Sequence, residues 1–197
     1  LTAAGADRVL TMDLHAAQIQ GFFDIPVDHL YAAPVLIRHL REHYVKDLNN
    51  LVVVSPDVGG VKMARAYSDA LGAELAIVAK HRFNATHVEA MNVIGEVEGR
   101  DVVLIDDMTE TAGTLCAAAN ILKERGAQRV FACVSHGVLG DMARDRISGS
   151  SIERVLTSDT VPMAHGPKVD CVSVGDLLGH AVQRIHDGES VSSLFDI

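Results

Sequence analysis

The stretch DVVLIDDMTETAGTLCAAANILKERG occupies residues 101–126 and decides the fold class. It begins with a short apolar run that is typical of a buried strand. Residues 111–125 then carry apolar side chains at the three- and four-residue spacing of a helix. Two aspartates and a turn of small and hydroxyl residues separate the two segments. A strand, a loop and a helix in this order form the repeating unit of α/β folds.

Short β-branched runs alternate with longer amphipathic stretches over the rest of the chain. Strands that are nearly continuously apolar and separated by helices form parallel sheets that helices cover on both faces. The sequence therefore predicts an α/β fold with a mainly parallel sheet. The expected strands are RVLTMDL (8–14), LVVVS (51–55), LAIVA (75–79), DVVLID (101–106), RVFACVS (129–135), RVLTS (154–158) and CVSV (171–174), and the expected helices span residues 34–48, 60–71, 111–125 and 174–185.

The composition is that of an acidic chain that can form a core. Of the 197 residues, 48% are hydrophobic, and 17 Lys and Arg stand against 26 Asp and Glu, which gives a formal net charge of −9. The apolar fraction excludes a disordered protein. The acidic balance argues against a nucleic-acid or anionic-membrane binder, because both need concentrated Lys and Arg to displace counterions.

The cysteines and the apolar runs indicate the cellular compartment of the protein. Cys116, Cys133 and Cys171 lie far apart in apolar stretches, so we expect reduced core thiols in a cytoplasmic protein. No apolar run approaches the about 18 residues of a membrane span. The first segment, LTAAGADRVLTMDLH, carries charges where a signal peptide would need an unbroken apolar stretch, so secretion is not expected.

The turn that joins strand and helix in residues 101–126 carries the chemistry. Small and hydroxyl residues that open a helix offer backbone N–H groups at its positive end, and a phosphate fits Thr111–Thr114. Asp106 and Asp107 are suited to accept hydrogen bonds from sugar hydroxyls or to hold Mg²⁺. The alternative is a capped helix, in which Thr109 and Glu110 only favour the N-terminus.

This stretch resembles the phosphoribosyl-pyrophosphate loop of the phosphoribosyltransferase-like superfamily. Three further motifs are together similar to the ribose-phosphate pyrophosphokinase family, which makes phosphoribosyl pyrophosphate from ATP and ribose 5-phosphate. The resemblance runs from Leu1 to Ile197 in the family's order. The motifs are TMDLHAAQIQGFFDIPVDHLYAAP (11–34), VVVSPDVGGVK (52–62) and GESVSSLF (188–195).

The resemblance implies the type I phosphoribosyltransferase-like fold and an incomplete chain. Family members are longer and contain two tandem domains of this fold. We therefore expect residues 1–31 to be the end of the first domain, residues 32–186 to be the second domain, and residues 187–197 to be a tail that packs on the first. The absence of an initiator Met before Leu1 fits a fragment. Because the first domain supplies much of the adenine-nucleotide pocket in the family, we expect this chain alone to bind ATP weakly.

The implied reaction transfers the β,γ-pyrophosphoryl group of Mg-ATP to the anomeric hydroxyl of ribose 5-phosphate. Family membership also implies a Mg²⁺ cofactor and hexamers built from dimers. Two alternatives stay open: a phosphoribosyltransferase that consumes phosphoribosyl pyrophosphate, and a non-catalytic regulatory homologue or fragment of the synthetase. The stretch TMDLHAAQIQGFF (11–23), Asp57 and the tail argue against the first alternative. The retained site residues argue against a degenerate homologue, whereas the absent first domain favours a fragment.

Two residues match metal-linked positions of the family. His15 ends the first expected strand and matches a His that helps to hold Mg-ATP, and Asp57 in the turn SPDVGG (55–60) matches a carboxylate. Without the resemblance, both would be interpreted as ordinary polar residues of local turns. The double glycine favours function, because it lets the backbone approach a ligand closely.

Lys80 and Arg82 follow the expected strand 75–79 and match the family's catalytic Lys and a substrate-binding Arg. Two cations on one loop can neutralise charge that develops on the transferred group. The alternative is a solvated basic pair. Family loops carry further basic residues after the Arg, whereas Phe83 and Asn84 follow here, so closure over the phosphates is expected to be weaker.

The ribose 5-phosphate site implied by the resemblance combines Arg82 with the loop at 106–114. Glu110 stands where Asp is usual, and Met63 follows Lys62 where an Arg is frequent, so fine substrate geometry is expected to differ. The matched residues are Arg82, Asp106, Asp107, Glu110, Thr111, Ala112, Gly113 and Thr114.

Gln20, Ser190 and Ser192 match positions that line a regulatory anion site between subunits in the phosphate-activated class. Ala17 departs from the pattern, since a hydroxyl residue is common there. The alternative is that the tail only packs Leu194 and Phe195 against the first domain.

Other features have simpler explanations. His39 and His43 have a metal-binding spacing on an expected helix, but no Glu base or third ligand accompanies them, which favours an exposed polar face. Cys116 is expected to be a core residue and not a nucleophile. The sequence Ser135-His136-Gly137 ends a strand near the ligand edge, where it is placed to contact substrate.

Overall fold

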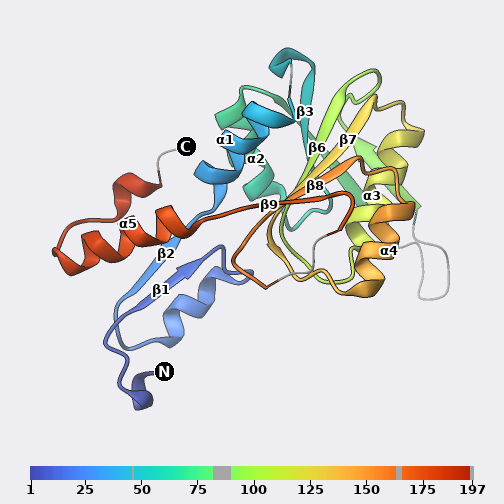
Figure 1. Ribbon diagram of the computed structural model, residues 1–197. Coiled ribbons are helices and arrows are strands. Elements are labelled where there is room, and N and C mark those ends of the chain that lie inside the picture. The colour runs from blue at the N-terminus through green and yellow to red at the C-terminus, as the bar shows by residue number, and fades with distance from the viewer. Residues whose placement is uncertain (46, 82–89, 163–165, 196–197) are drawn as a thin grey trace.

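A seven-stranded sheet forms the centre of the computed structural model, which describes residues 1–45, 47–81, 90–162 and 166–195 (Figure 1). Its order is β5-β4-β3-β6-β7-β8-β9, and all neighbours pair in parallel except β4 and β5. The prediction of a mainly parallel α/β sheet is confirmed. The strands are β3 (Leu51–Ser55), β4 (Glu74–His81), β5 (Ala90–Ile94), β6 (Asp101–Thr109), β7 (Arg129–Gly137), β8 (Arg154–Ser158) and β9 (Val169–Val172).

Helices cover both faces of this sheet because alternate strand residues point to opposite sides. Val53 and Val103 face one apolar cluster, which Leu36 of α1 (Ala33–His43) and Tyr67 of α2 (Val61–Leu71) complete. The neighbouring positions, such as Val52 and Leu104, face a second cluster with α3 (Gly113–Glu124) and α4 (Asp141–Gly149). The central strands β3 and β6 are therefore buried on both sides, which explains their continuous apolar runs in the sequence.

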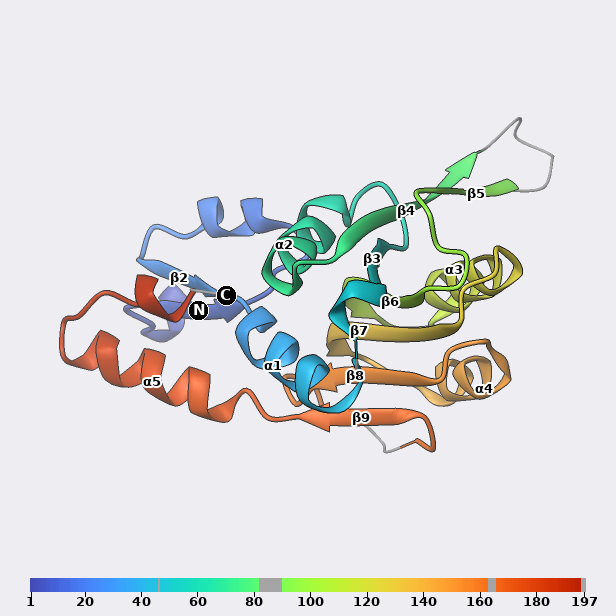
Figure 2. The ribbon, with the colours of Figure 1, turned by 90° about the horizontal axis from the view of Figure 1, so that it is seen from above.

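A separate two-stranded sheet lies to one side of this core (Figure 2). It pairs β1 (Val9–Met12) with β2 (Val27–Leu30) in parallel, and α5 (Gly175–His186) lies beside it. The ring of Phe195, near the end of the chain, lies 5.9 Å from the ring of Tyr31 in an edge-to-face contact. The division at residues 31 and 186 stays a prediction. Short 3₁₀ helices at Thr2–Ala4, Ala17–Phe22, Leu48–Asn50 and Ser192–Leu194 complete the elements.

Several elements differ from the sequence-based expectations. The hydrophobic pattern of the sequence did not predict β2, β5 or α4. The strands β2 and β5 are short and depend on their partner strands, and α4 is rich in charged residues. The first expected helix ends at His43 instead of residue 48. Cys116 and Cys133 are buried as expected, but Cys171 is exposed. The expectation of a core thiol was wrong there, because β9 is the edge strand of the sheet.

Candidate functional site

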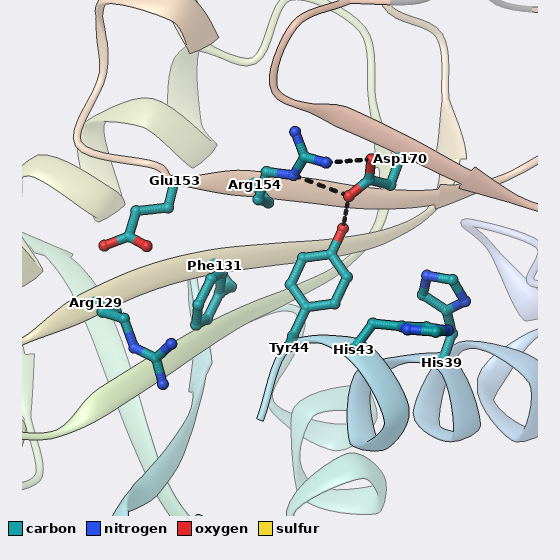
Figure 3. A pocket seen from close by; sticks show the side chains of 8 residues that line it. All are labelled: His39, His43, Tyr44, Arg129, Phe131, Glu153, Arg154 and Asp170. Carbon is teal, nitrogen blue, oxygen red and sulfur yellow. Dashed lines mark hydrogen bonds and ion pairs between the residues drawn. The ribbon is translucent and has the colours of Figure 1, made fainter. Parts of the chain in front are cut away.

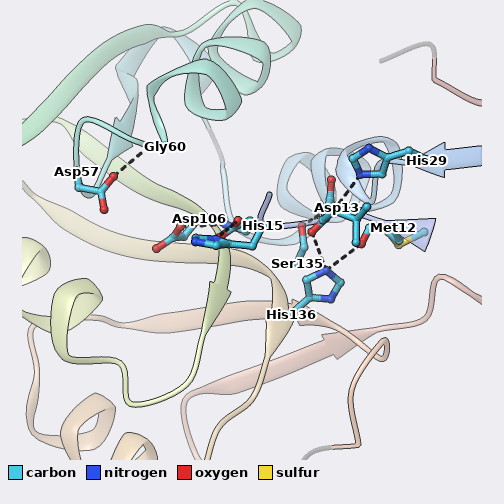
Figure 4. Close-up of polar contacts among 11 residues, drawn as sticks. Met12, Asp13, His15, His29, Asp57, Gly60, Asp106, Ser135 and His136 are labelled. Atoms are coloured by element: carbon cyan, nitrogen blue, oxygen red, sulfur yellow. Dashed lines mark hydrogen bonds and ion pairs between the residues drawn. The ribbon is translucent and has the colours of Figure 1, made fainter. Parts of the chain in front are cut away.

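The carboxyl ends of β3, β6 and β7 lie at one edge of the sheet, and the end of β1 reaches the same place (Figure 4). In parallel sheets, the loops beyond this edge form ligand sites. The structure brings together three segments that the sequence analysis singled out separately, namely those that carry His15, Asp57 and the acidic pair of β6.

His15 and Asp107 form the contact that joins β1 to this edge. Nδ1 of His15 lies 2.7 Å from Oδ2 of Asp107, although 92 residues separate them. The hydrogen bond to Asp107 raises the pKa of His15, and the charges of Asp107, Asp106 and Asp57 add to this shift. The imidazole side chain remains 75% exposed, so a ligand at this edge can reach it.

Asp106 is a carboxyl group in an unfavourable position for a negative charge. Burial, followed by the charge of Asp107, raises the pKa of Asp106 to about 7, and the charge of Asp57 adds a smaller contribution. The N–H of Asp107 donates to Oδ1 of Asp106 at 3.0 Å and partly offsets the effect. Three carboxylates thus act on one another here, and a cation or hydroxyl donor would relieve their repulsion.

A tight turn after β3 holds Asp57. Its Oδ1 accepts a hydrogen bond from the N–H of Gly60 at 3.0 Å, and Oγ of Ser55 donates to its backbone carbonyl at 2.7 Å. A Cβ on Gly60 would lie only 3.0 Å from Oγ of Ser55. The glycine is therefore needed for this close turn, which ends as α2 begins at Val61.

A buried polar cluster fixes the segment that leads to His15. Oδ2 of Asp13 accepts hydrogen bonds from Oγ of Ser135 at 2.6 Å and from the N–H of Ala32 at 3.0 Å. His136 lies against the same segment, with Nε2 3.0 Å from the carbonyl oxygen of Met12. Both ring nitrogens contact protein atoms, with Nδ1 2.7 Å from Oγ1 of Thr160, and the expected contact of the segment 135–137 with substrate stays a prediction.

The loop at 111–114 begins α3 with an unusual backbone. Ala112 has a φ of 55° and is the N-cap residue, so the helix begins at Gly113 with no capping side chain. Among the described residues, Ala112 and Asp13 are the only non-glycine residues with positive φ. Strained backbone of this kind persists where the surrounding structure imposes it, often at functional sites. The exposed Glu110 and Thr111 lead into this turn from the end of β6.

The basic residues of the expected site are only partly described. Lys80 lies at the carboxyl end of β4, where it pairs with Met91 of β5 in the register of the two strands. Arg82 and residues 83–86 lie outside the described residues. The sheet topology therefore puts the backbone of Lys80 at the same edge as the acidic pair.

A match to the model of a known family identifies the family of this chain. Residues 82–196 match the model of the phosphoribosyl synthetase-associated domain. The chain belongs to the phosphoribosyl synthetase-associated domain family. The resemblance found in the sequence motifs is thereby confirmed.

Curated relatives of this phosphoribosyl synthetase-associated chain are similar to it along nearly its whole length. A ribose-phosphate pyrophosphokinase of Chlorobaculum tepidum is 52% identical over 198 residues, which span 100% of this chain and 61% of the relative. A ribose-phosphate pyrophosphokinase of Burkholderia pseudomallei is 52% identical over 99% of this chain and 62% of the relative. The chain thus spans about three fifths of the length of these relatives.

A solved structure confirms the fold of the phosphoribosyl synthetase-associated chain. The phosphoribosylpyrophosphate synthetase of Mycobacterium smegmatis superimposes with a TM-score of 0.87 at 38% identity, over 95% of this chain and 61% of that chain. The expected type I phosphoribosyltransferase-like fold class is therefore correct. None of the helices in the described ranges is long and apolar enough to cross a membrane.

The described contacts do not bring the expected regulatory residues Gln20, Ser190 and Ser192 into one cluster. Oγ of Ser190 donates to Oγ of Ser192 at 3.0 Å. Gln20 contacts the carbonyl oxygen of Ala17 at 3.1 Å and Nδ1 of His29 at 3.1 Å. The two serines therefore lie together, and the anion site that would join them to Gln20 stays a prediction.

The Mg²⁺ expected for the family has an incomplete set of ligands here. In the part of the chain that the structure describes, no three His, Cys, Asp or Glu side chains are grouped to hold a metal ion. Mg²⁺ usually takes one or two carboxylates and completes its shell with water and substrate phosphates. The carboxylate of Asp57 beside the acidic pair fits this pattern.

A cavity of about 440 Å³ lies away from this site, at the amino ends of β7 and β8 (Figure 3). The rings of His39 and His43 lie 4.3 Å apart at its margin, and Arg154 and Tyr44 both bind Asp170. Burial of Tyr44 and its contact with Asp170 raise the pKa of the phenol. The cavity is lined by His39, His43, Tyr44, Arg129, Phe131, Glu153, Arg154 and Asp170.

Sequence reasoning missed Arg146 and the role of Asp13. Nη1 of Arg146 donates to the carbonyl oxygen of Thr111 at 3.0 Å, across 35 residues. The charged segment 141–149 gave no signal for this contact, because its spacing did not predict a helix over the loop. Asp13 lay beside the more conspicuous His15 in the sequence, and only the fold brings Ser135 to it.

Proposed function

We propose that this chain is the substrate-binding part of a ribose-phosphate pyrophosphokinase. The reaction joins the anomeric oxygen of ribose 5-phosphate to the β-phosphorus of ATP. The bond between that phosphorus and the oxygen that bridges to the α-phosphorus breaks, AMP leaves, and the proton of the hydroxyl passes to solvent. The observation that carries the proposal is the convergence of the acidic pair, His15 and the opening of α3 at one sheet edge.

The sugar phosphate would lie along the loop between β6 and α3. Its 5-phosphate would accept hydrogen bonds from backbone N–H groups at residues 111–114, where the positive end of α3 favours an anion. The ribose hydroxyls would donate to Asp106 and Asp107, with Glu110 at the margin. Hydroxyl donors suit these carboxylates, because each hydrogen bond offsets the burial and the repulsion that together raise the pKa of Asp106.

The nucleotide would approach from the side of His15 and Asp57. Asp57 would hold Mg²⁺ together with phosphate oxygens, and Mg²⁺ when bound would shield the charge of the triphosphate. The exposed ring of His15 would contact the nucleotide while Asp107 fixes its orientation. Lys80 and Arg82 would stabilise the charge on the moving group, as electrostatic catalysis of phosphoryl transfer requires.

Because the chain alone is expected to bind ATP weakly, the assay for this proposal incubates a full-length version, with the first domain that the family implies, with ATP, ribose 5-phosphate and Mg²⁺. AMP and phosphoribosyl pyrophosphate should form in equal amounts, and Lys80→Ala should lower the rate by about 10²–10³-fold. A parallel incubation with phosphoribosyl pyrophosphate and nucleobases separates the transferase alternative. Nucleotide formation there, without product from ATP, would overturn the proposal.

A further inference from the structure

Arg146 reaches from α4 over the loop that opens α3. Its Nη1 donates to the carbonyl oxygen of Thr111 at 3.0 Å. A Cβ on Gly113 would lie 3.4 Å from the same nitrogen, at van der Waals contact, so the guanidinium lies beside the first residue of the helix. The charge of Arg146 also acts on the Cys116 thiol in the first turn, where it opposes the rise in pKa that burial causes. The guanidinium therefore lies along the start of α3.

Within the described ranges Arg146, like Arg41 and Arg125, has no carboxylate partner, whereas most of the other arginines have one. Arg144, two residues earlier on the same helix, pairs with Asp141, and Arg129 of β7 pairs with Asp101. What distinguishes Arg146 from Arg41 and Arg125 is its position beside the loop that opens α3. The guanidinium of Arg146 has five N–H groups, and the carbonyl oxygen of Thr111 accepts one of them.

The exposed position of Arg146 would favour a bound anion. The N-terminus of a helix carries about half a positive charge, so cations are disfavoured there and favoured at C-termini. Arg146 places a full positive charge beside that end of α3. Two positive groups that converge on one loop indicate that the missing partner is a negatively charged ligand.

We propose that Arg146 binds the 5-phosphate of the sugar substrate and is a further substrate-binding residue. This inference rests on the proposed function, because it takes the loop at 111–114 as the phosphate site. The contact with Thr111 holds the guanidinium in place, and its remaining N–H groups donate to phosphate oxygens. A planar guanidinium suits this task because it can offer two parallel N–H groups to an oxyanion.

Calorimetric titration tests this role with two probes, ribose 5-phosphate and ribose. Arg146→Gln retains a side-chain donor but removes the charge. It should weaken ribose 5-phosphate binding by about tenfold and leave ribose binding unchanged, since only the phosphate meets the guanidinium. Arg146→Lys retains a point charge and should lose less. The matched control is Arg144→Gln on the same helix, which should bind both probes as the unmodified protein does.

Each outcome of the titration has a defined meaning. Equal ribose 5-phosphate affinity in Arg146→Gln and the unmodified protein would overturn the inference and leave the proposed function intact. Equal losses for both probes would overturn it as well, because they would show that Arg146 only positions the loop through Thr111. An unmodified protein that binds neither probe would refute the proposed function itself. Circular dichroism of each variant checks that α3 and α4 remain folded.

Discussion

Oγ of Ser135 donates a 2.6 Å hydrogen bond to Oδ2 of Asp13, although 122 residues separate the two side chains. Asp13 is only 6% exposed and lies in left-handed backbone with a φ of 40°. The contact joins the end of β1 to the end of β7. It therefore couples the two-stranded sheet to the edge where the candidate site lies, and it fixes the approach of the chain to His15.

Removal of the Asp13 carboxylate should destabilise the fold. Asp13→Ala leaves the hydroxyl of Ser135 and the N–H of Ala32 without their acceptor, and it adds a residue that disfavours positive φ. We expect a loss of about 2–4 kcal/mol in the free energy of unfolding, measured with urea. Asp13→Asn is the control, because Asn tolerates this backbone and retains an acceptor oxygen, so it should lose less. A loss below about 0.5 kcal/mol in Asp13→Ala would contradict the coupling.

Protonation of Asp106 should make stability depend on pH. The pKa of about 7 in the folded protein lies above the usual value near 3.9, so the folded state holds a proton that the unfolded chain has lost between these values. Stability should therefore fall as the pH rises through this window. Asp106→Asn should be more stable than the unmodified protein by about 1–3 kcal/mol at pH 8, and the difference should vanish near pH 4.

Urea unfolding at pH 4, 6 and 8 measures this effect. Asp145→Asn serves as the matched control for the loss of one carboxylate, because Asp145 is exposed on α4. A variant Asp106→Asn that is less stable than the unmodified protein at pH 8 would show that the charge of Asp106 is stabilised in the folded state.

The sequence predicted those parts of the fold that local burial determines. The bounds of β3 and β8 agree with the expected runs at 51–55 and 154–158, because fully buried β-branched residues leave one favourable conformation. β6 extends three residues beyond the expected end, to Thr109. Its polar end is a strand because Met108 and Thr109 pair with His136 and Gly137 of β7. Such pairing depends on contacts that no local pattern contains.

The candidate site also contains residues whose proximity the sequence predicted and contacts that it did not predict. The acidic pair and Asp57 follow apolar strands, so the rule that parallel strands end at one edge predicts their proximity. No sequence pattern predicted the contact of Arg146 with Thr111, since it depends on how α4 packs against α3. The expectation for Cys171 was wrong because an apolar neighbourhood in sequence does not distinguish an edge strand from a central one.

Cys171 should be the single fast-reacting thiol of the folded protein. It is exposed on β9, whereas Cys116 and Cys133 are buried. Partial burial and the charge of Asp159 raise the pKa of Cys171, so the reaction should accelerate with pH. A chromogenic disulfide reagent should modify one thiol rapidly and the other two only after unfolding. Cys171→Ser should abolish the rapid phase, and a rapid phase that persists in this variant would place another thiol at the surface.

Gly137 should tolerate no side chain, because β7 and β8 approach too closely there. A Cβ on Gly137 would lie 2.6 Å from Oγ1 of Thr157, a fully buried residue, at a point where the register of the two strands shifts. Gly137→Ala should therefore lower the free energy of unfolding by about 2–3 kcal/mol, measured with urea.

Two comparisons distinguish this steric effect from a general effect of alanine. Gly179→Ala, in the interior of α5, meets nothing within 4 Å and should stabilise the fold by up to about 1 kcal/mol. Thr157→Ala in the Gly137→Ala background removes Oγ1, the closest atom at 2.6 Å, and Cγ2, but keeps Cβ at 3.1 Å, so it should recover part of the loss. The hydroxyl of Thr157 has no hydrogen-bond partner among the described residues, so its deletion breaks no polar contact there. If Gly137→Ala is neutral, β7 and β8 must be able to separate. The contact of His136 with Met12 would then be loose as well.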